Sequence, residues 1–264
     1  MTPVAIVTGA SAGIGTELAR VFARNGHALV LVARREDRLQ ALAAELAASG
    51  VPSPLVLAID LAEPDGAARI GAALAAHNLA PQYLVNNAGF GLAGHAAECD
   101  RDTLLAMIDL NVRALTDLSL AFIGGLSRHR GGILNVASVA GFLPGPGQAV
   151  YYATKAYVLS FSEALHSELK PHGVRVTALC PGPVSTEFQA RAGVIARRTP
   201  FLELPAARVA AEGYRGLMRG RRLVVPGFGN KVMVFLPRVL PRTLVLGAAD
   251  RRQRSRLASS APRT

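Results

Sequence analysis

A glycine-rich turn near the N-terminus constrains the fold of this 264-residue chain more than any other feature. Residues 3–8 form a short apolar run typical of a buried parallel strand, and residues 17–24 read as an amphipathic helix. The turn between them contains Gly9, Gly13 and Gly15. Glycine allows a phosphate to approach the backbone closely, and a helix N-terminus offers free N–H groups. Because many strand–helix turns contain glycine, this turn indicates a dinucleotide site only in combination with other features.

Apolar runs alternate with helical stretches along most of the chain. This alternation predicts an α/β fold, namely a doubly wound Rossmann fold with a seven-stranded, mostly parallel sheet in a single domain. The predicted strands are 3–8, 28–33, 54–58, 82–86, 132–137, 174–180 and 222–225. The predicted helices are 13–25, 35–49, 63–77, 102–127 and 150–171. We expect this domain to span 1–226 and to be followed by a basic, apolar extension, 227–264, with a disordered end from Ser255 onward.

The end of the second predicted strand carries residues that select between dinucleotides. A binder of the non-phosphorylated dinucleotide usually places an acidic residue here, where it binds the adenosine 2′-hydroxyl. This chain has Ala33 and then Arg34, whose guanidinium suits a 2′-phosphate in charge and in geometry. We therefore predict NADP(H) as the cofactor. The alternative is that Arg34 and Arg35 only begin the next helix in solvent, or are diverted by Glu36 and Asp37.

A second set of residues can perform acid–base chemistry. Tyr151 and Lys155 are four residues apart, which puts the phenol and the ammonium on one face of a helix. A free tyrosine has a pKa near ~10, and a neighbouring ammonium is expected to lower it. The hydroxyl of Ser138 can hold and polarise a carbonyl oxygen. Taken alone, a Tyr-x-x-x-Lys pair is more often a packed ring beside a solvated amine.

Further motifs occur in a fixed order along residues 3–190. With the glycine turn and the Ser-Tyr-Lys set, they resemble the classical short-chain dehydrogenases/reductases, and residues 31–39 look like those of an NADP-preferring subgroup. Each motif is weak alone, but chance does not account for all of them in this order. The motifs are Thr8-Gly-x-x-x-Gly13-x-Gly15, Asp60, Asn86-Asn87-Ala88-Gly89, Asn111, Ser138, Tyr151-x-x-x-Lys155 and Pro181-Gly182-Pro183-Val184-Ser185-Thr186.

The resemblance implies an oxidoreductase that interconverts a carbonyl and an alcohol by hydride transfer. Tyr151 would be the general acid or base, and Lys155 would lower its pKa and bind the nicotinamide ribose. Ser138 would position the substrate carbonyl, and Asn111 would hold a water that links Lys155 to solvent. Without the resemblance, Asn111 reads as a locally satisfied helix residue.

The resemblance also implies a set of cofactor-binding residues. Asp60 would contact the adenine, although alone it equally reads as a helix cap. Val184 and Thr186 would meet the nicotinamide carboxamide. The full set is Gly9, Ser11, Gly13, Ile14, Gly15, Arg34, Asp60, Leu61, Asn87, Ala88, Gly89, Tyr151, Lys155, Pro181, Gly182, Val184 and Thr186.

We expect a mostly apolar substrate pocket, with residues 187–205 as a lid because they form a long connection beside the last motif. An apolar pocket favours a hydrophobic ketone or aldehyde. Lid arginines at 191, 197 and 198 leave a 3-oxoacyl thioester on acyl carrier protein as an alternative. A non-catalytic NADP-binding sensor or scaffold is disfavoured, because the whole catalytic set is present. The expected pocket residues are Phe90, Leu92, Phe142, Gln148 and Phe188.

Charge is unevenly distributed. The formal net charge is +11, and residues 191–264 hold 16 Lys and Arg against 3 Asp and Glu. Within 231–249, Arg238 and Arg242 interrupt the apolar run, so a membrane span is not expected. This stretch would pack on its own domain or a partner subunit, lie on an anionic membrane surface through 231–256, or meet an acidic partner.

The remaining expectations concern partners and compartment. The predicted helices 102–127 and 150–171 look like those that build dimer interfaces in the family, so we expect a homodimer or homotetramer. Cys99 and Cys180 give no disulfide framework and no metal-ligand spacing, so no metal site is expected. No signal peptide or nucleic-acid motif is evident. We predict a cytoplasmic protein, with association at the membrane surface as the alternative.

Overall fold

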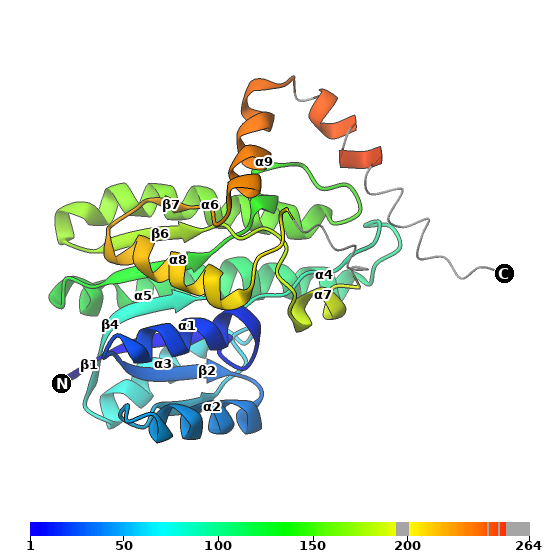
Figure 1. Ribbon diagram of the computed structural model, residues 1–264. Helices are drawn as coiled ribbons and strands as arrows, with labels where there is room; N and C mark the ends of the chain where they lie inside the picture. Colours follow the sequence, from blue (N-terminus) through cyan, green and yellow to red (C-terminus); the bar gives the residue numbers. More distant parts are fainter. Residues whose placement is uncertain (194–200, 242, 248, 252–264) are drawn as a thin grey trace.

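The computed structural model describes residues 1–193, 201–241, 243–247 and 249–251. Seven strands form one sheet between layers of helices (Figure 1). They lie in the order β3-β2-β1-β4-β5-β6-β7, and all the pairings between neighbours are parallel. The predicted doubly wound α/β fold is confirmed, with a sheet that is wholly parallel in the described residues. The strands are β1 (Thr2–Thr8), β2 (Ala28–Ala33), β3 (Leu55–Ala58), β4 (Leu79–Asn86), β5 (Gly132–Val136), β6 (Arg175–Leu179) and β7 (Leu223–Val224).

The central strands are continuous apolar runs because helices cover both of their faces. Every residue of β5 is buried, and β1 is buried from Val4 to Thr8. One layer packs Leu18 and Phe22 of α1 against the sheet, and the other packs Phe122 and Leu165. The first layer contains α1 (Gly13–Arg24), α2 (Glu36–Ala48) and α8 (Ala206–Met218). The second layer contains α3 (Gly66–Ala76), α5 (Leu115–Arg128) and α6 (Ala149–Leu169).

The predicted helix 102–127 is interrupted. The chain forms α4 (Arg101–Ile108), then a π-helical turn (Asp109–Ala114), and only then α5. The turn contains Asn111, whose side chain bonds to the backbone of Phe90. Isolated π-helical turns inside α-helices are frequent at functional sites. The periodicity of the sequence therefore located the helical region correctly but not the break within it.

The chain reverses its direction across the sheet between β1 and β4, so the loops after these strands diverge and leave a crevice. The hydroxyl of Thr8 holds the two strand ends together. It donates to the carbonyl oxygen of Val85 over 3.1 Å and accepts from the backbone N–H groups of Asn87 and Ala88, at 3.0 and 3.1 Å. The backbone groups that lose their partners in the sheet are thereby satisfied.

The C-terminal extension begins with a helix, α9 (Phe228–Val239), which projects from the body of the molecule (Figure 1). The side-chain amide of Asn230 anchors it by donating to the carbonyl oxygens of Leu202, at 3.0 Å, and Pro226, at 2.9 Å. Val234 is buried in a cluster with residues of β6 and α6. The predicted disordered end lies outside the described residues. Among the described helices, none is long and apolar enough to cross a membrane.

A buried chain of polar side chains links the sheet to two helices of the second layer, α5 and α6. The amide of Asn86 donates to Ser119 of α5 and to Asn135 of β5, at 3.0 and 2.9 Å. The amide of Asn135 donates to the hydroxyl of Ser162 on α6 over 2.9 Å. Removing one member leaves a buried polar group without its partner, which costs free energy of folding.

Ser162→Ala should therefore lower the free energy of unfolding by about 1–3 kcal/mol. Ser160 is an exposed serine two residues earlier on the same helix, and Ser160→Ala should change stability by less than about 0.5 kcal/mol. Urea denaturation of both variants measures the difference. Equal stabilities for the two variants would show that the buried chain contributes nothing.

Candidate active site

A cavity of about 930 Å³ lies at the carboxyl ends of the strands. Most of the predicted site residues line it. From the cofactor set these are Gly9, Ser11, Gly13, Ile14, Arg34, Asp60, Leu61, Asn87, Ala88, Gly89, Pro181, Gly182, Val184 and Thr186. From the catalytic and substrate sets they are Ser138, Tyr151, Lys155, Phe90, Gln148 and Phe188.

Four predicted residues lie outside this wall in the described part of the chain. Gly15 is packed inside the turn, and Asn111 is buried behind Phe90. Leu92 is half-buried in the loop after β4, and Phe142 packs against an apolar cluster of α6 and β6. These four residues do not line the cavity, and the motifs in the sequence do not predict which way a side chain packs.

The glycine turn is shaped to admit a phosphate. Gly9 and Gly13 have φ values of +64° and +57°, a left-handed region that side chains disfavour. A Cβ on Gly15 would lie 2.2 Å from the carbonyl oxygen of Gly9 and 2.4 Å from the amide nitrogen of Asn87. The turn and the N-terminus of α1 therefore form the backbone cradle that a pyrophosphate requires. A dinucleotide fits the residues present.

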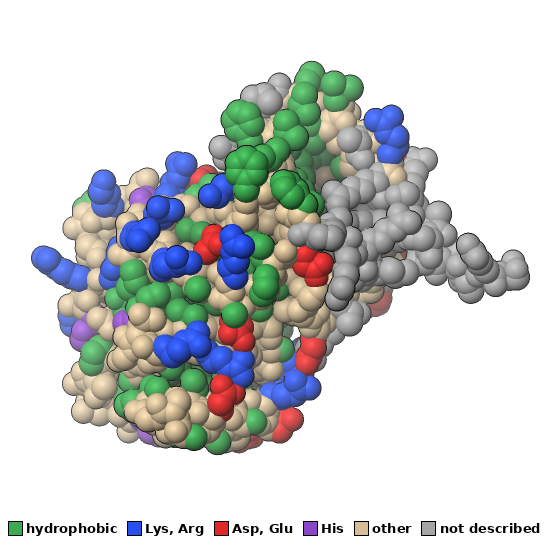
Figure 2. Space-filling model, in the orientation of Figure 1, with side chains coloured by type: hydrophobic (Ala, Val, Ile, Leu, Met, Phe, Trp, Pro, Cys, Tyr) green, Lys and Arg blue, Asp and Glu red, His purple; other side chains and the backbone are tan. Residues whose placement is uncertain are grey.

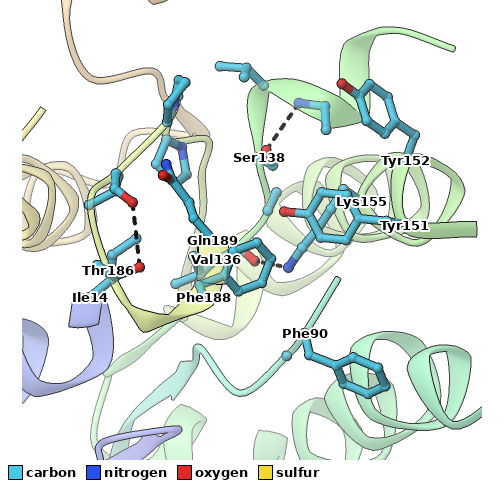
Figure 3. A pocket seen from close by; sticks show the side chains of 18 of the residues that line it. Ile14, Phe90, Val136, Ser138, Tyr151, Tyr152, Lys155, Thr186, Phe188 and Gln189 are labelled. Atoms are coloured by element: carbon cyan, nitrogen blue, oxygen red, sulfur yellow. Dashed lines mark hydrogen bonds between the residues drawn. The ribbon is translucent and has the colours of Figure 1, made fainter. Parts of the chain in front are cut away.

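The Ser-Tyr-Lys set comes together as predicted. Ser138 follows β5, while Tyr151 and Lys155 project from α6 (Figure 3). The ammonium of Lys155 donates to the carbonyl oxygen of Val136 over 2.9 Å. It also lies 5.9 Å from the centre of the Tyr151 ring. One helical turn and the end of one strand are enough to place all three groups.

Burial controls the titration of this set. It raises the pKa of the Tyr151 phenol to about 12, against the opposing effect of a hydrogen bond with Ser138. It lowers the pKa of the Lys155 ammonium to about 8, because a buried charge loses its hydration. The expectation that Lys155 brings the pKa of Tyr151 down is therefore wrong for this structure. Loss of hydration is the largest effect on the pKa of each of the two groups.

Asn111 fixes the loop that faces the catalytic set. Its amide oxygen accepts from the N–H of Phe90 over 3.0 Å, and its amide nitrogen donates to the Phe90 carbonyl oxygen over 2.9 Å. The same nitrogen donates to the hydroxyl of Thr154, 3.2 Å away and next to Lys155. A Cβ on Gly89 would lie 2.8 Å from Asn111 and 3.7 Å from the Lys155 nitrogen. The three residues are thus close neighbours.

The predicted lid, residues 187–205, contacts Tyr151 near its first residue. α7 (Glu187–Arg191) carries Phe188, whose ring centre lies 5.7 Å from that of Tyr151 (Figure 3). Residues 194–200 of this segment lie outside the described residues. Tyr152, on the other side, also lines the cavity.

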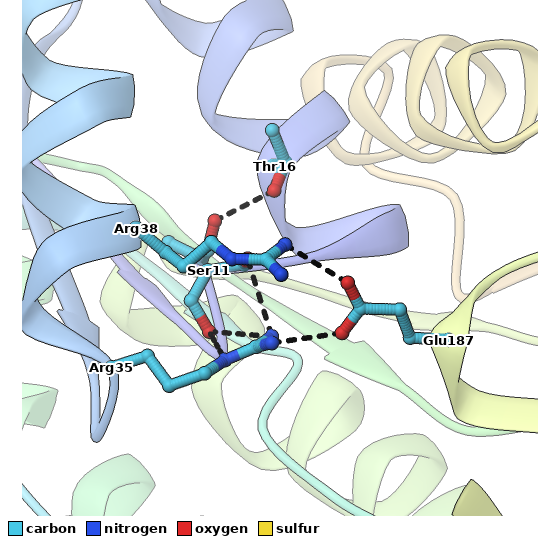
Figure 4. A network of polar contacts seen from close by, with 6 residues as sticks. Ser11, Thr16, Arg35, Arg38 and Glu187 are labelled. Carbon is cyan, nitrogen blue, oxygen red and sulfur yellow. Dashed lines mark hydrogen bonds and ion pairs between the residues drawn. The ribbon is translucent and has the colours of Figure 1, made fainter. Parts of the chain in front are cut away.

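Arginines surround the far end of the cavity. Arg34 lies 3.6 Å from a carboxylate oxygen of Asp60, and its side chain is 65% exposed. Arg35 bonds to the hydroxyl and carbonyl oxygens of Ser11, and to Glu187 over 2.8 Å (Figure 4). Arg38 reaches the other oxygen of Glu187 over 2.9 Å. Sequence reasoning assigned the anion-binding role to Arg34 alone and considered Arg35 only as part of the start of the next helix, but Arg35 also lines the cavity.

The C-terminal extension supplies a wall of the cavity that sequence analysis did not assign. Its side chains are mostly apolar, and four of them recur at the spacing of one helical face. That spacing was the available signal. These residues are Met233, Leu236, Pro237, Leu240, Val245 and Ala249.

Comparison with known proteins places this geometry in a family. The model of the family described as short chain dehydrogenase matches residues 3–194. A sulfoacetaldehyde reductase from Chromohalobacter salexigens is 41% identical over 191 residues, which cover 71% of this chain and 75% of the relative. The chain belongs to the short-chain dehydrogenase family, as its motifs predicted. Members of this family are oxidoreductases, so the predicted enzyme class is confirmed.

Two solved structures resemble the whole chain. A short-chain dehydrogenase from Sphingobium yanoikuyae in complex with NADPH is 33% identical, with a TM-score of 0.79, covering 99% of this chain and 97% of that one. A bulky-bulky ketone specific alcohol dehydrogenase from Comamonas testosteroni is 28% identical, with a TM-score of 0.74, covering 100% and 96%. The similarity therefore includes the C-terminal extension, which the family model does not match.

The buried ammonium predicts a pH dependence of stability. Since the pKa of Lys155 falls from 10.5 to about 8 on folding, the unfolded chain binds more protons between these values. The free energy of unfolding of the wild type should therefore rise with pH across this window, relative to Lys155→Met, by up to about 3 kcal/mol. Urea denaturation at pH 7.5 and pH 10 checks this. A constant difference between the two proteins contradicts the lowered pKa.

Proposed function

We propose that the protein is an NADP(H)-dependent oxidoreductase that interconverts a hydrophobic ketone or aldehyde and the corresponding alcohol. The observation that carries this proposal is the continuity of the cavity. It runs from the arginines, past the glycine turn, to the Ser-Tyr-Lys set and on to the apolar wall of α9. Membership of the family and the NADPH complex of a relative support the cofactor.

NADPH, when bound, would supply the hydride. In our proposal the chain supplies orientation and a proton. The hydroxyl of Ser138 holds the substrate oxygen next to the phenol of Tyr151. Because burial raises the pKa of Tyr151 to about 12, the phenol keeps its proton at neutral pH and donates it to the developing alkoxide.

Lys155 and Asn111 take supporting roles in this proposal. The ammonium of Lys155 is held by Val136 and faces the cavity, where it can bind the ribose of the nicotinamide nucleotide. Asn111 positions the Phe90 loop and is proposed to hold the water that links Lys155 to solvent. In this proposal neither residue transfers the proton to the substrate itself; Lys155 binds the cofactor, and Asn111 positions the loop and the water.

The proposed substrate follows from the apolar end of the cavity. Phe188 packs on Tyr151, and Met233, Leu236 and Leu240 of the C-terminal region complete the wall. Burial of apolar substrate surface against these side chains favours bulky carbonyl compounds. The relative from Comamonas testosteroni, which is specific for bulky-bulky ketones, supports this substrate class.

The protein is also proposed to form a homodimer or homotetramer through α4, α5 and α6. These helices carry exposed large apolar side chains, which commonly mark association surfaces. The residues are Leu105, Ile108, Leu120 and Tyr157.

Tyr151→Phe tests the catalytic assignment. It should lower kcat for ketone reduction by about 10²–10⁴-fold, because the acid is lost, and leave the Kd for NADPH within about twofold. Tyr157→Phe removes an exposed phenol from the same helix and serves as the control. NADPH consumption against a series of aliphatic, aromatic and steroid ketones measures kcat, and fluorescence titration measures Kd. Unchanged turnover by Tyr151→Phe would falsify the acid–base role.

Arg34→Ala and Arg35→Ala test the cofactor preference. Each removes a charged donor near the proposed 2′-phosphate, so each should weaken NADPH binding by about 10–100-fold and change NADH binding by less than about threefold. Arg38→Ala is the control, because Arg38 pairs with Glu187 without lining the main cavity. Equal losses of NADPH and NADH binding would count against a phosphate-specific role.

A further inference from the structure

The C-terminal region exposes large apolar side chains that the proposed chemistry does not use. We call this surface the α9 patch. Phe228 is 75% exposed and Phe235 is 59% exposed, and Figure 2 shows apolar side chains gathered on the projecting part of the molecule. Apolar surface concentrated in this way marks an interaction site. The patch consists of Phe228, Val232, Phe235, Leu236, Leu240, Leu244 and Leu246.

Contacts at the start and in the middle of α9 fix the orientation of the α9 patch. Asn230, which is buried, ties the start of α9 to Leu202 and Pro226. Val234 is buried in the cluster with Val139 and Val158, whereas Phe228 and Phe235 of the same helix are exposed. Because one face of α9 is anchored in the core, the other face stays exposed and is not a frayed end.

The patch contains an exposed basic side chain, Lys231, and further exposed arginines lie on α8. In the sequence, residues 191–264 carry 16 Lys and Arg against 3 Asp and Glu. Figure 2 shows Lys and Arg side chains on the same face of the molecule, over α8. An apolar surface with basic neighbours matches a bilayer that presents anionic headgroups above an acyl interior. The exposed basic residues of α8 and the turn after it are Arg208, Arg215, Arg219, Arg221 and Arg222.

Two patch residues also belong to the cavity. Leu236 and Leu240 line the cavity wall and are 47% and 46% exposed, so they form its rim. A second copy of the chain seated here would cover this rim, whereas a bilayer surface would supply apolar molecules to it. The rim therefore favours lipid over a protein partner as the occupant of the patch.

We propose that the α9 patch docks on an anionic lipid bilayer, with the apolar side chains inserted at the level of the headgroups. Docking places the rim of the cavity at the membrane surface. A carbonyl compound dissolved in the membrane could then enter the cavity directly, and this part of the inference rests on the proposed function. Docking itself is measured without turnover, so the two proposals fail separately.

The full-length protein should be sedimented with vesicles of phosphatidylcholine alone and of phosphatidylcholine mixed equally with phosphatidylglycerol. We expect binding to the mixed vesicles, at least tenfold weaker binding to neutral vesicles, and release at high salt because screening weakens the headgroup attraction. Absence of binding to the mixed vesicles overturns the proposal. Equal binding to both kinds of vesicle overturns the role of the basic residues.

The double variant Phe228→Ser/Phe235→Ser should bind mixed vesicles at least tenfold more weakly and keep wild-type affinity for NADPH, since neither residue lines the cavity. Ala47→Ser changes an exposed side chain of α2, a helix of the first layer that is not among the proposed oligomer helices, and should bind vesicles like the wild type. Vesicle binding that survives the double substitution, or is lost with Ala47→Ser, places the contact elsewhere. Sedimentation equilibrium completes the test: a smaller oligomer for the double variant than for the wild type would assign the patch to a second copy.

Discussion

Hydrogen bonds connect the ends of β1 and β4, and they fix the starting points of two loops that face the cavity. At this point the chain turns away on both sides, so backbone groups lose their partners in the sheet. Thr8 replaces those partners with its hydroxyl, and the amide of Asn87 donates to the carbonyl oxygens of Thr8 and Gly9. The glycine turn and the loop that carries Phe90 therefore start from one rigid junction. A small change in this junction would move the glycine turn and the Phe90 loop relative to each other.

Sequence alone predicted the fold and most of the residues that line the cavity. All seven strands were located, because a parallel sheet covered on both faces needs continuous apolar runs that are easy to recognise. The proximity of Tyr151 and Lys155 was predicted because their spacing is local: the two residues share one helical turn. The glycine turn was found because its neighbours, β1 and α1, give it a structural context.

The features that were missed depend on contacts distant in sequence or on the environment of a charge. The π-helical turn lies where the side chain of Asn111 bonds to the backbone of Phe90, 21 residues earlier. The hydrophobic periodicity of the sequence cannot predict such a contact. α8 contains two glycines that permit close packing on β6 and β7 but weaken any prediction of a helix. The pKa of Tyr151 was expected to fall because attraction can be inferred from spacing, whereas the extent of burial cannot. The contact of Arg35 with Glu187 was not predicted because it joins residues 152 positions apart.

This last contact has a practical consequence for anyone who wishes to redesign the protein to use NADH. Replacing Arg35 by an uncharged residue removes more than a positive charge, because it also breaks one of the two ion pairs described above for Glu187, at the start of α7. That helix carries Phe188, which rests against Tyr151. A substitution at Arg35 that is meant to alter cofactor preference can therefore also shift Phe188 at the proposed substrate end of the cavity. To change the first property without the second, a new partner for Glu187 has to replace the lost ion pair.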